Sequence, residues 1–388
     1  MTYIPRILDT LITERLNRGM VISVLGARRT GKTTLLQHLI QTITLDIAYL
    51  NGDNDFDVAL FERITPSIWN QVLGNKRAVF IDEAQRIPNI GRAVKLLIDH
   101  RNDVQVFISG SSSFQVMNLT EEPLTGRKYE YTLHPFSFSE LSAYHGMLEE
   151  QRRLEERLLF GSYPQIVTEG EYAQEHLMLI RESFWRDLFA YDGLRKPKVL
   201  ENLLKALAYQ LGSEVSPSEL GSLLGVHRAT VESYLSLLEQ AHIIFRLPAY
   251  STNLRNEIKK SSKYYFWDTG VRNAIIGRFD PIAARDDVGP LWENYLVSER
   301  RKLLSYHRSG QQFFWRTTDG MEVDYIEQTG AAIKAFEFKY SETKKSRVTR
   351  AFTNRYPEVE VKTINRINYP EFLLFEKTPT MEHILPAT

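Results

Sequence analysis

The sequence has 388 residues, more than a single hydrophobic core usually organises, so two or three domains are expected. Its 48 basic and 48 acidic residues cancel, so no field of the whole molecule draws it to nucleic acid or to an anionic membrane, and any such binding must be local. The absence of cysteine excludes disulfides, thiolate metal sites and cysteine catalysis. Charged residues interrupt the first sixteen positions and no apolar run approaches about 20 residues, so we expect no signal peptide, no membrane span and a cytoplasmic location.

The first third of the chain predicts strands that alternate with helices. Apolar runs at residues 20–25, 47–50, 78–81 and 104–109 predict strands, and residues 33–43 and 94–98 have helical spacing. This alternation predicts an α/β fold in which a mainly parallel sheet carries helices on both faces.

A phosphate-binding loop is predicted directly after the first strand. Two glycines separated by four residues and followed by lysine and threonine match the P-loop pattern, because glycine lets backbone N–H groups turn inward and approach a phosphate closely. Lys32 is expected to lie across the β and γ phosphates, and Thr33 to bind magnesium, while the following helix directs its positive end at the phosphates. A plain glycine turn is disfavoured, since the motif follows an apolar strand and opens an amphipathic helix. The predicted ligands are ATP and Mg²⁺, and the residues expected to bind them are Gly26, Ala27, Arg28, Arg29, Thr30, Gly31, Lys32, Thr33 and Thr34.

An acidic pair at the end of another predicted strand supplies the second half of this site. Asp82 is expected to emerge at the carboxyl end of the strand and hold magnesium through water. Glu83 is placed to polarise the attacking water as a general base. Alone the pair is weak evidence, because helix N-termini also favour acidic residues. Together with a P-loop about 50 residues upstream, it predicts nucleotide hydrolysis.

Two further residues are candidates for catalytic roles. Ser111 follows the strand at 104–109 and is expected to contact the γ phosphate, with a plain turn serine as the alternative. Arg127 follows a predicted turn and is a candidate arginine finger acting across a subunit boundary, which would require a homo-oligomer. A solvated surface arginine is the alternative reading.

These motifs resemble a family of bacterial and archaeal AAA-type ATPases, in which a P-loop core is followed by a winged helix and a restriction-endonuclease-like region. The resemblance covers nearly the whole chain and is carried by Gly26–Thr33, Phe80–Gln85, Gly110–Ser112, Leu124–Arg127 and His134–Phe138. It implies a P-loop ATPase core at 1–135, a helical lid or adaptor at 136–194, a winged-helix region and linker at 195–285, and an α/β restriction-endonuclease-like domain at 286–388.

A helix-turn-helix is predicted in the third of these parts. Ser216 and Glu219 form a capping box, and Gly225 separates that helix from a second one beginning near Arg228. The second helix could enter a DNA major groove with Arg228 and Thr230 near base edges and nearby lysines near phosphates; a packing module without DNA is the alternative. The core-facing residues are Val231, Tyr234, Leu235 and Leu238, the outward ones His227, Arg228, Thr230 and Ser233, and the lysines Lys259, Lys260 and Lys263.

A second metal site is predicted near the C-terminus. Period-two geometry puts Glu337 and Lys339 on one face of a strand, where they could meet Asp324 of the preceding strand. With Glu293 these residues resemble the acid-acid-lysine site of restriction-endonuclease-like folds, in which carboxylates hold magnesium and the lysine steadies the attacking water. An ordinary solvated strand face and an inactive remnant used for binding remain alternatives.

Three functional hypotheses remain open. The leading one is an ATP-driven machine that handles duplex or branched DNA. The second is a nucleotide-controlled signalling switch that grips a protein partner, which the neutral net charge favours slightly. The third makes the C-terminal region a nuclease gated by the ATPase.

Overall fold

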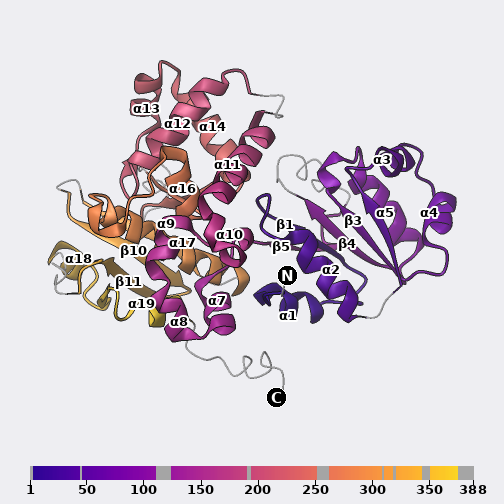
Figure 1. Cartoon of the computed structure of the whole chain (residues 1–388), viewed down its shortest axis with the longest axis horizontal. Helices are drawn as coiled ribbons and strands as arrows, with labels where there is room; N and C mark the ends of the chain where they lie inside the picture. Colours follow the sequence, from indigo (N-terminus) through magenta and orange to yellow (C-terminus); the bar gives the residue numbers. More distant parts are fainter. Residues whose placement is uncertain are drawn as a thin grey trace. The chain divides into compact units, whose positions relative to one another are not determined.

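The fold is described from a computed structural model of the chain (Figure 1). The structure describes residues 3–43, 46–110, 124–189, 194–250, 262–307, 310–317, 320–342 and 350–374. It divides into two compact units, one formed by Met1–Phe136 with Gln240–His242 and the other by Ser137–Glu239 with Ile243–Thr388. The predicted subdivision of the second unit into three parts stays a prediction.

The first unit contains a five-stranded sheet in the order β2-β3-β4-β1-β5, in which every neighbouring pair is parallel. Its strands are β1 (Val21–Leu25), β2 (Ile47–Asn51), β3 (Ala78–Asp82), β4 (Gln105–Gly110) and β5 (Lys128–Thr132). Its helices are α1 (Ile7–Thr13), α2 (Lys32–Thr42), α3 (Asp55–Glu62), α4 (Pro66–Leu73), the short 3₁₀ turn η1 (Ala84–Arg86) and α5 (Ile90–His100). The predicted parallel α/β fold is therefore confirmed for this unit.

Burial explains why these runs form strands. β1, β3 and β4 are buried along their whole length, as expected for central strands of a parallel sheet covered on both faces. One face packs Val79 and Ile81 against Phe61 of α3, Trp69 of α4 and Leu97 of α5. Because parallel strands end at one edge, the loops after β1, β3 and β4 come together there, where open α/β sheets bind ligands.

The second unit is mixed in secondary structure. It begins with the helices α7 (Phe138–His145), α8 (Met147–Arg152), α9 (Leu154–Phe160), α10 (Pro164–Thr168), η2 (Gly170–Tyr172) and α11 (Ala173–Phe189). Three helices and an antiparallel sheet in the order β6-β8-β7 follow, namely α12 (Pro197–Tyr209), β6 (Glu214–Val215), α13 (Pro217–Leu224), α14 (Arg228–Gln240), β7 (Ile244–Pro248) and β8 (Ser262–Phe266).

A four-stranded mixed sheet in the order β12-β11-β10-β9 forms the rest of this unit. β10 (Glu322–Thr329) pairs antiparallel with both β9 (Gln311–Arg316) and β11 (Ala332–Phe338), whereas β12 (Val361–Ile364) is parallel to β11. The accompanying helices are α16 (Thr269–Ile276), η3 (Ile282–Ala284), α17 (Val288–His307), α18 (Arg350–Arg355) and α19 (Tyr369–Leu373). Across the described part of the chain, none of the helices combines the length and apolarity required to span a bilayer.

Candidate functional site

The predicted phosphate loop connects β1 to α2 at the carboxyl edge of the parallel sheet. Gly26 has a φ of 147°, and a Cβ there would lie 2.3 Å from the carbonyl oxygen of Leu133. Gly31 has a φ of 91° and caps α2 without a side-chain hydrogen bond to the first turn. The loop thus needs glycine at both positions for backbone reasons, and it leaves the amino end of α2 directed at the loop.

Lys32 is folded back onto its own loop. Its Nζ donates to the carbonyl oxygens of Gly26 at 3.1 Å and Ala27 at 2.7 Å, and the residue is buried. Thr30, also buried, closes the loop by donating from Oγ1 to the Ala27 carbonyl at 2.9 Å. The ammonium is therefore held inside the loop, where a phosphate bound by the loop would meet it.

Asp82 is the centre of a hydrogen-bond network at the same edge of the sheet. Thr33 Oγ1 lies 3.2 and 3.0 Å from its two carboxylate oxygens, and Tyr49 Oη donates to Oδ2 at 3.1 Å. The Ser109 hydroxyl and the Glu83 backbone N–H also donate to this carboxylate. Burial, and next the charge of Asp82, raise the pKa of Tyr49 to about 12, so its hydroxyl stays a donor. The hydroxyl of Thr33 and the carboxylate of Asp82 form the oxygen donor set that Mg²⁺ prefers, so the residues fit this ion.

Glu83 adopts a strained backbone conformation beside Asp82. Its φ of 48° and ψ of 41° lie in the left-handed region, which non-glycine residues rarely occupy. Its N–H lies 3.3 Å from Ser109 Oγ, and its carboxylate accepts a hydrogen bond from the Gln85 amide. Gly52 packs so closely that an added Cβ would lie 2.3 Å from the Glu83 carbonyl oxygen. These contacts fix the backbone of Glu83, and Gln85 orients its carboxylate.

Arg6 anchors the phosphate loop from the N-terminal segment, a contact that the sequence did not predict. It is buried and donates to the carbonyl oxygens of Thr30 at 3.1 Å and His134 at 2.6 Å. Its guanidinium carbon lies 4.3 Å from the ring centroid of Phe136. Arg6 thereby joins the loop to the segment that follows β5.

The two further catalytic candidates have different outcomes. Ser111 lies outside the described residues, and the polar side chain that β4 brings to Asp82 is Ser109, two positions earlier. Arg127 precedes β5, which pairs with β1 from Lys128 onward, so it lies at the amino edge of the sheet. There it forms an ion pair with Asp99 of α5. At about 3.3 Å per residue, the strand length separates it from the phosphate loop of its own chain, and a role across a subunit boundary stays a prediction.

The structure brings together the residues predicted for the C-terminal metal site. Lys339 Nζ lies 3.8 Å from Asp324 Oδ2 and 3.7 Å from Glu337 Oε2. Asp324 Oδ2 also accepts a hydrogen bond of 2.7 Å from the backbone N–H of Phe338. Glu293 of α17, Asp324 and Lys339 line a cavity of about 490 Å³. Burial raises the pKa of Glu293 to about 6 although Lys263 opposes the shift.

Two residues missing from that prediction complete the cluster. Glu322 of β10, Glu293 and Asp324 each offer a carboxylate oxygen within 4.8 Å of the others. Lys263 lies between them, with Nζ 2.8 Å from Glu293 Oε1 and in contact with Glu322. The expectation that Lys263 faces phosphates is wrong, because the residue is fully buried among these acids. Lys259 and Lys260 lie outside the described residues.

The burial of α14 agrees with the predicted orientation of the helix. Val231, Tyr234, Leu235 and Leu238 are buried. His227, Arg228 and Ser233 are exposed, and Thr230 is half-buried. Arg228 pairs with Glu232 one turn later, at 2.8 Å, so the exposed face carries both signs of charge.

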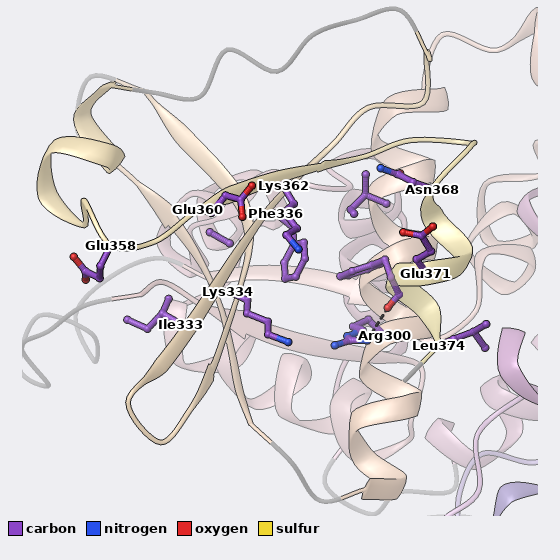
Figure 2. Close-up of a pocket in the computed structure, with 13 residues that line it drawn as sticks. Arg300, Ile333, Lys334, Phe336, Glu358, Glu360, Lys362, Asn368, Glu371 and Leu374 are labelled. Atoms are coloured by element: carbon purple, nitrogen blue, oxygen red, sulfur yellow. Dashed lines mark hydrogen bonds between the residues drawn. The ribbon is translucent and has the colours of Figure 1, made fainter. Parts of the chain in front are cut away.

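A second cavity, of about 590 Å³, is lined by residues of β11, β12, α17 and α19 (Figure 2). Arg300 projects toward it, but its guanidinium is already held by Glu327 at 2.6 and 2.9 Å and by the Phe372 carbonyl at 2.6 Å. The charged residues around it are of both signs, namely Arg300, Lys334, Lys362, Glu358, Glu360 and Glu371. This mixture selects no ligand class.

Comparisons with known proteins agree with the geometry of the first unit. Residues 18–142 match the family described as AAA domain, and residues 151–281 and 288–371 match two families described as domains of unknown function (DUF8612 and DUF4143). The Walker-type ATPase of Pyrococcus abyssi superposes with a TM-score of 0.50 at 15% identity, covering 71% of this chain and 96% of that one. The first unit therefore has the fold of an AAA-type P-loop ATPase.

Two curated relatives share most of the chain's length. An uncharacterized protein of Mycobacterium tuberculosis is 25% identical over 369 residues, covering 92% of this chain and 78% of its own length. An uncharacterized protein of Haemophilus influenzae is 25% identical over 343 residues, covering 81% of this chain and 80% of its own length. The similarity therefore extends beyond the AAA domain into the second unit.

Proposed function

We propose that this protein is a magnesium-dependent ATP hydrolase whose turnover drives work by its second unit. The observation that carries the proposal is the convergence of Lys32, Thr33, Asp82 and Ser109 at the carboxyl edge of one parallel sheet. A glycine-lined loop, a helix amino end and a buried ammonium favour a polyphosphate, and the adjacent hydroxyl and carboxylate favour a divalent ion beside it.

Each residue then has a separate task. Lys32 would exchange its bonds to the loop carbonyls for bonds to phosphate oxygens. Thr33 and Asp82 would hold magnesium, which would neutralise charge on the phosphates. Ser109 and Tyr49 fix the orientation of the Asp82 carboxylate. Glu83, adjoining in the chain, orients and deprotonates the attacking water, and its strained backbone supports a functional role at this position.

Separate measurements of nucleotide binding and phosphate release test this proposal. Lys32→Ala should weaken the binding of a fluorescent ATP analogue by about 30-fold or more, because it removes a charge-assisted contact worth about 2–3 kcal/mol. Glu83→Gln should leave binding within about threefold and reduce phosphate release by at least about 100-fold, since the base is lost while the ligands of the nucleotide remain.

The matched control is Glu62→Gln, the same change at an exposed position of α3. It should leave both binding and turnover unaffected. Normal phosphate release by the Lys32 and Glu83 variants would remove the assignment.

A specific observation favours DNA as the substrate handled. The element order α12-β6-α13-α14-β7-β8, with three helices and a three-stranded antiparallel sheet, supports a winged helix, and His227, just before α14, is exposed together with Arg228 and Ser233 of that helix. Such a helix presents polar groups to a major groove. The pairing of Arg228 with Glu232 implies that DNA must compete with an internal partner, so binding should be weak and salt-dependent.

Fluorescence anisotropy with labelled duplex and branched DNA at low salt tests this role. Arg228→Gln should weaken binding about threefold to tenfold, whereas Arg152→Gln, at an exposed position of α8, should not. Turnover should rise when DNA is added. Absence of binding in every nucleotide state, with turnover rising only when a protein partner is supplied, would favour the signalling switch instead.

A further inference from the structure

The position of Lys263 changes the interpretation of the C-terminal acidic cluster. Lys263 belongs to β8, the middle strand of its sheet, and pairs there with Glu214 of β6 and Leu247 of β7. Its backbone is therefore fixed from both sides. Its side chain, which is fully buried, extends to Glu293 of α17 and Glu322 of β10.

The ammonium pairs with two of the three carboxylates that a metal ion would need. It donates to Glu293 Oε1 at 2.8 Å and contacts Glu322, and these two carboxylates are the partners that Asp324 would require to complete a three-oxygen site. Tyr265 Oη donates to the same Glu293 oxygen at 2.6 Å, so that oxygen already has two donors. The Phe314 ring lies beneath the ammonium, with its centroid 5.4 Å from Nζ.

The charges of the cluster are also nearly balanced without a metal ion. The acids are Glu293, Glu322, Asp324 and Glu337, and the bases that face them are Lys263, Arg316 and Lys339. A divalent cation would add two positive charges beside a buried ammonium that cannot leave without losing its contacts with Glu293 and Glu322. The residues present therefore do not fit a resident divalent ion.

We propose that Lys263 is the resident cation of this carboxylate cluster, and that the cluster fastens the β6-β8-β7 sheet to α17 and β10 instead of cleaving nucleic acid with a metal ion. Lys263 thus acts as a positioning residue that joins two parts of the second unit. This inference is independent of the ATPase, because it concerns residues of the second unit alone.

Manganese binding, measured from the electron paramagnetic resonance signal of the free ion, tests the proposal on full-length protein. The Asp82→Asn background removes the carboxylate of the nucleotide site. In that background we expect no manganese site below millimolar concentration, whereas the further change Lys263→Met should create one with at least about tenfold higher affinity. Adding Asp324→Asn should abolish the new site.

Two results would overturn the proposal. One is a micromolar manganese site that is present in protein with Lys263 intact and is lost on Asp324→Asn. This comparison does not depend on whether a Lys263 variant folds. The other is a folded Lys263→Met variant, verified by circular dichroism, that gains no site. Supercoiled plasmid incubated with manganese and the protein that retains Lys263 should stay intact. Nicking that is lost on Asp324→Asn would likewise overturn the proposal.

Discussion

Replacing Arg6 by methionine should destabilise the first unit and weaken nucleotide binding together. The guanidinium donates to the carbonyls of Thr30 and His134 and lies over Phe136, whereas methionine keeps the apolar stem and loses all three interactions. A hydrogen bond from a charged group contributes about 1.5–3 kcal/mol, and the contact with the ring about 0.5–2 kcal/mol. Allowing for water that enters beside the freed carbonyls, we expect a loss of about 4 kcal/mol in the free energy of unfolding of this unit.

Native-state hydrogen exchange is the suitable assay, because two units need not unfold in one step and exchange reports each segment separately. Peptides that contain β1 and β4 should lose protection equivalent to that free energy, while peptides of the second unit should not change. Because Thr30 is part of the loop, the affinity for an ATP analogue should fall about tenfold, or about 1.4 kcal/mol.

Arg15→Met provides the control for Arg6→Met. Arg15 is exposed, with its guanidinium carbon 5.3 Å from the ring centroid of Tyr129, so the change should cost less than about 1 kcal/mol. Unchanged protection of β1 and β4 in Arg6→Met, within about 0.5 kcal/mol, would refute the idea that Arg6 anchors the loop.

Three more changes probe other parts of the structure. Gly52→Ala should lower turnover more than nucleotide binding, because the new Cβ would lie 2.3 Å from the Glu83 carbonyl oxygen and must displace it; equal effects on both would contradict this. Trp69→Ala should destabilise the first unit by about 3–5 kcal/mol in hydrogen exchange, since the fully buried indole also donates to the Ala93 carbonyl at 3.0 Å. Burial on its own would raise the pKa of Asp287, but hydrogen bonds and charges from Arg285 and Arg272 outweigh it and lower the pKa to about 2. The stability that the Asp287 carboxylate contributes is therefore present above its ordinary pKa of 3.8 and is lost as the pH falls toward 2. Asp287→Asn should therefore flatten the acid limb of a plot of melting temperature against pH, and an unchanged limb would exclude this residue as its cause.

The sequence predicted the glycine loop between a strand and a helix because this information is local. A strand, a glycine loop and a helix follow one another between residues 20 and 43, so the motif itself carries the geometry of Lys32 and Thr33. Asp82 was predictable because it ends a fully apolar strand, and parallel strands end at a common edge.

The partners of Asp82 were not predictable in the same way. Ser109 and Ser111 both follow the apolar part of one predicted strand, and the sequence does not show which of them lies near Asp82. The strand register, which pairs Ser109 with Val24, places Ser109 beside the P-loop strand. Tyr49 reaches Asp82 from β2, and Arg6 reaches the loop from the N-terminal segment. These contacts depend on tertiary packing, which the spacing of residues along the chain does not predict.

The error over Lys263 has the same origin and a larger consequence. Three lysines close together beside a predicted wing indicate phosphate contacts if they are exposed and internal ion pairs if they are buried. The sequence does not distinguish the two cases. Strand geometry alone allows either case, because successive side chains of a strand point to opposite faces, and the structure places Lys263 at the carboxylates of α17 and β10. Once it is buried, the cost of an unpaired ammonium requires acids around it, and acids that already hold a lysine are poor ligands for a metal ion. The burial of Lys263 thus favours an internal ion cluster over a phosphate contact. It also favours a domain that uses these carboxylates to hold its sheets together over a nuclease.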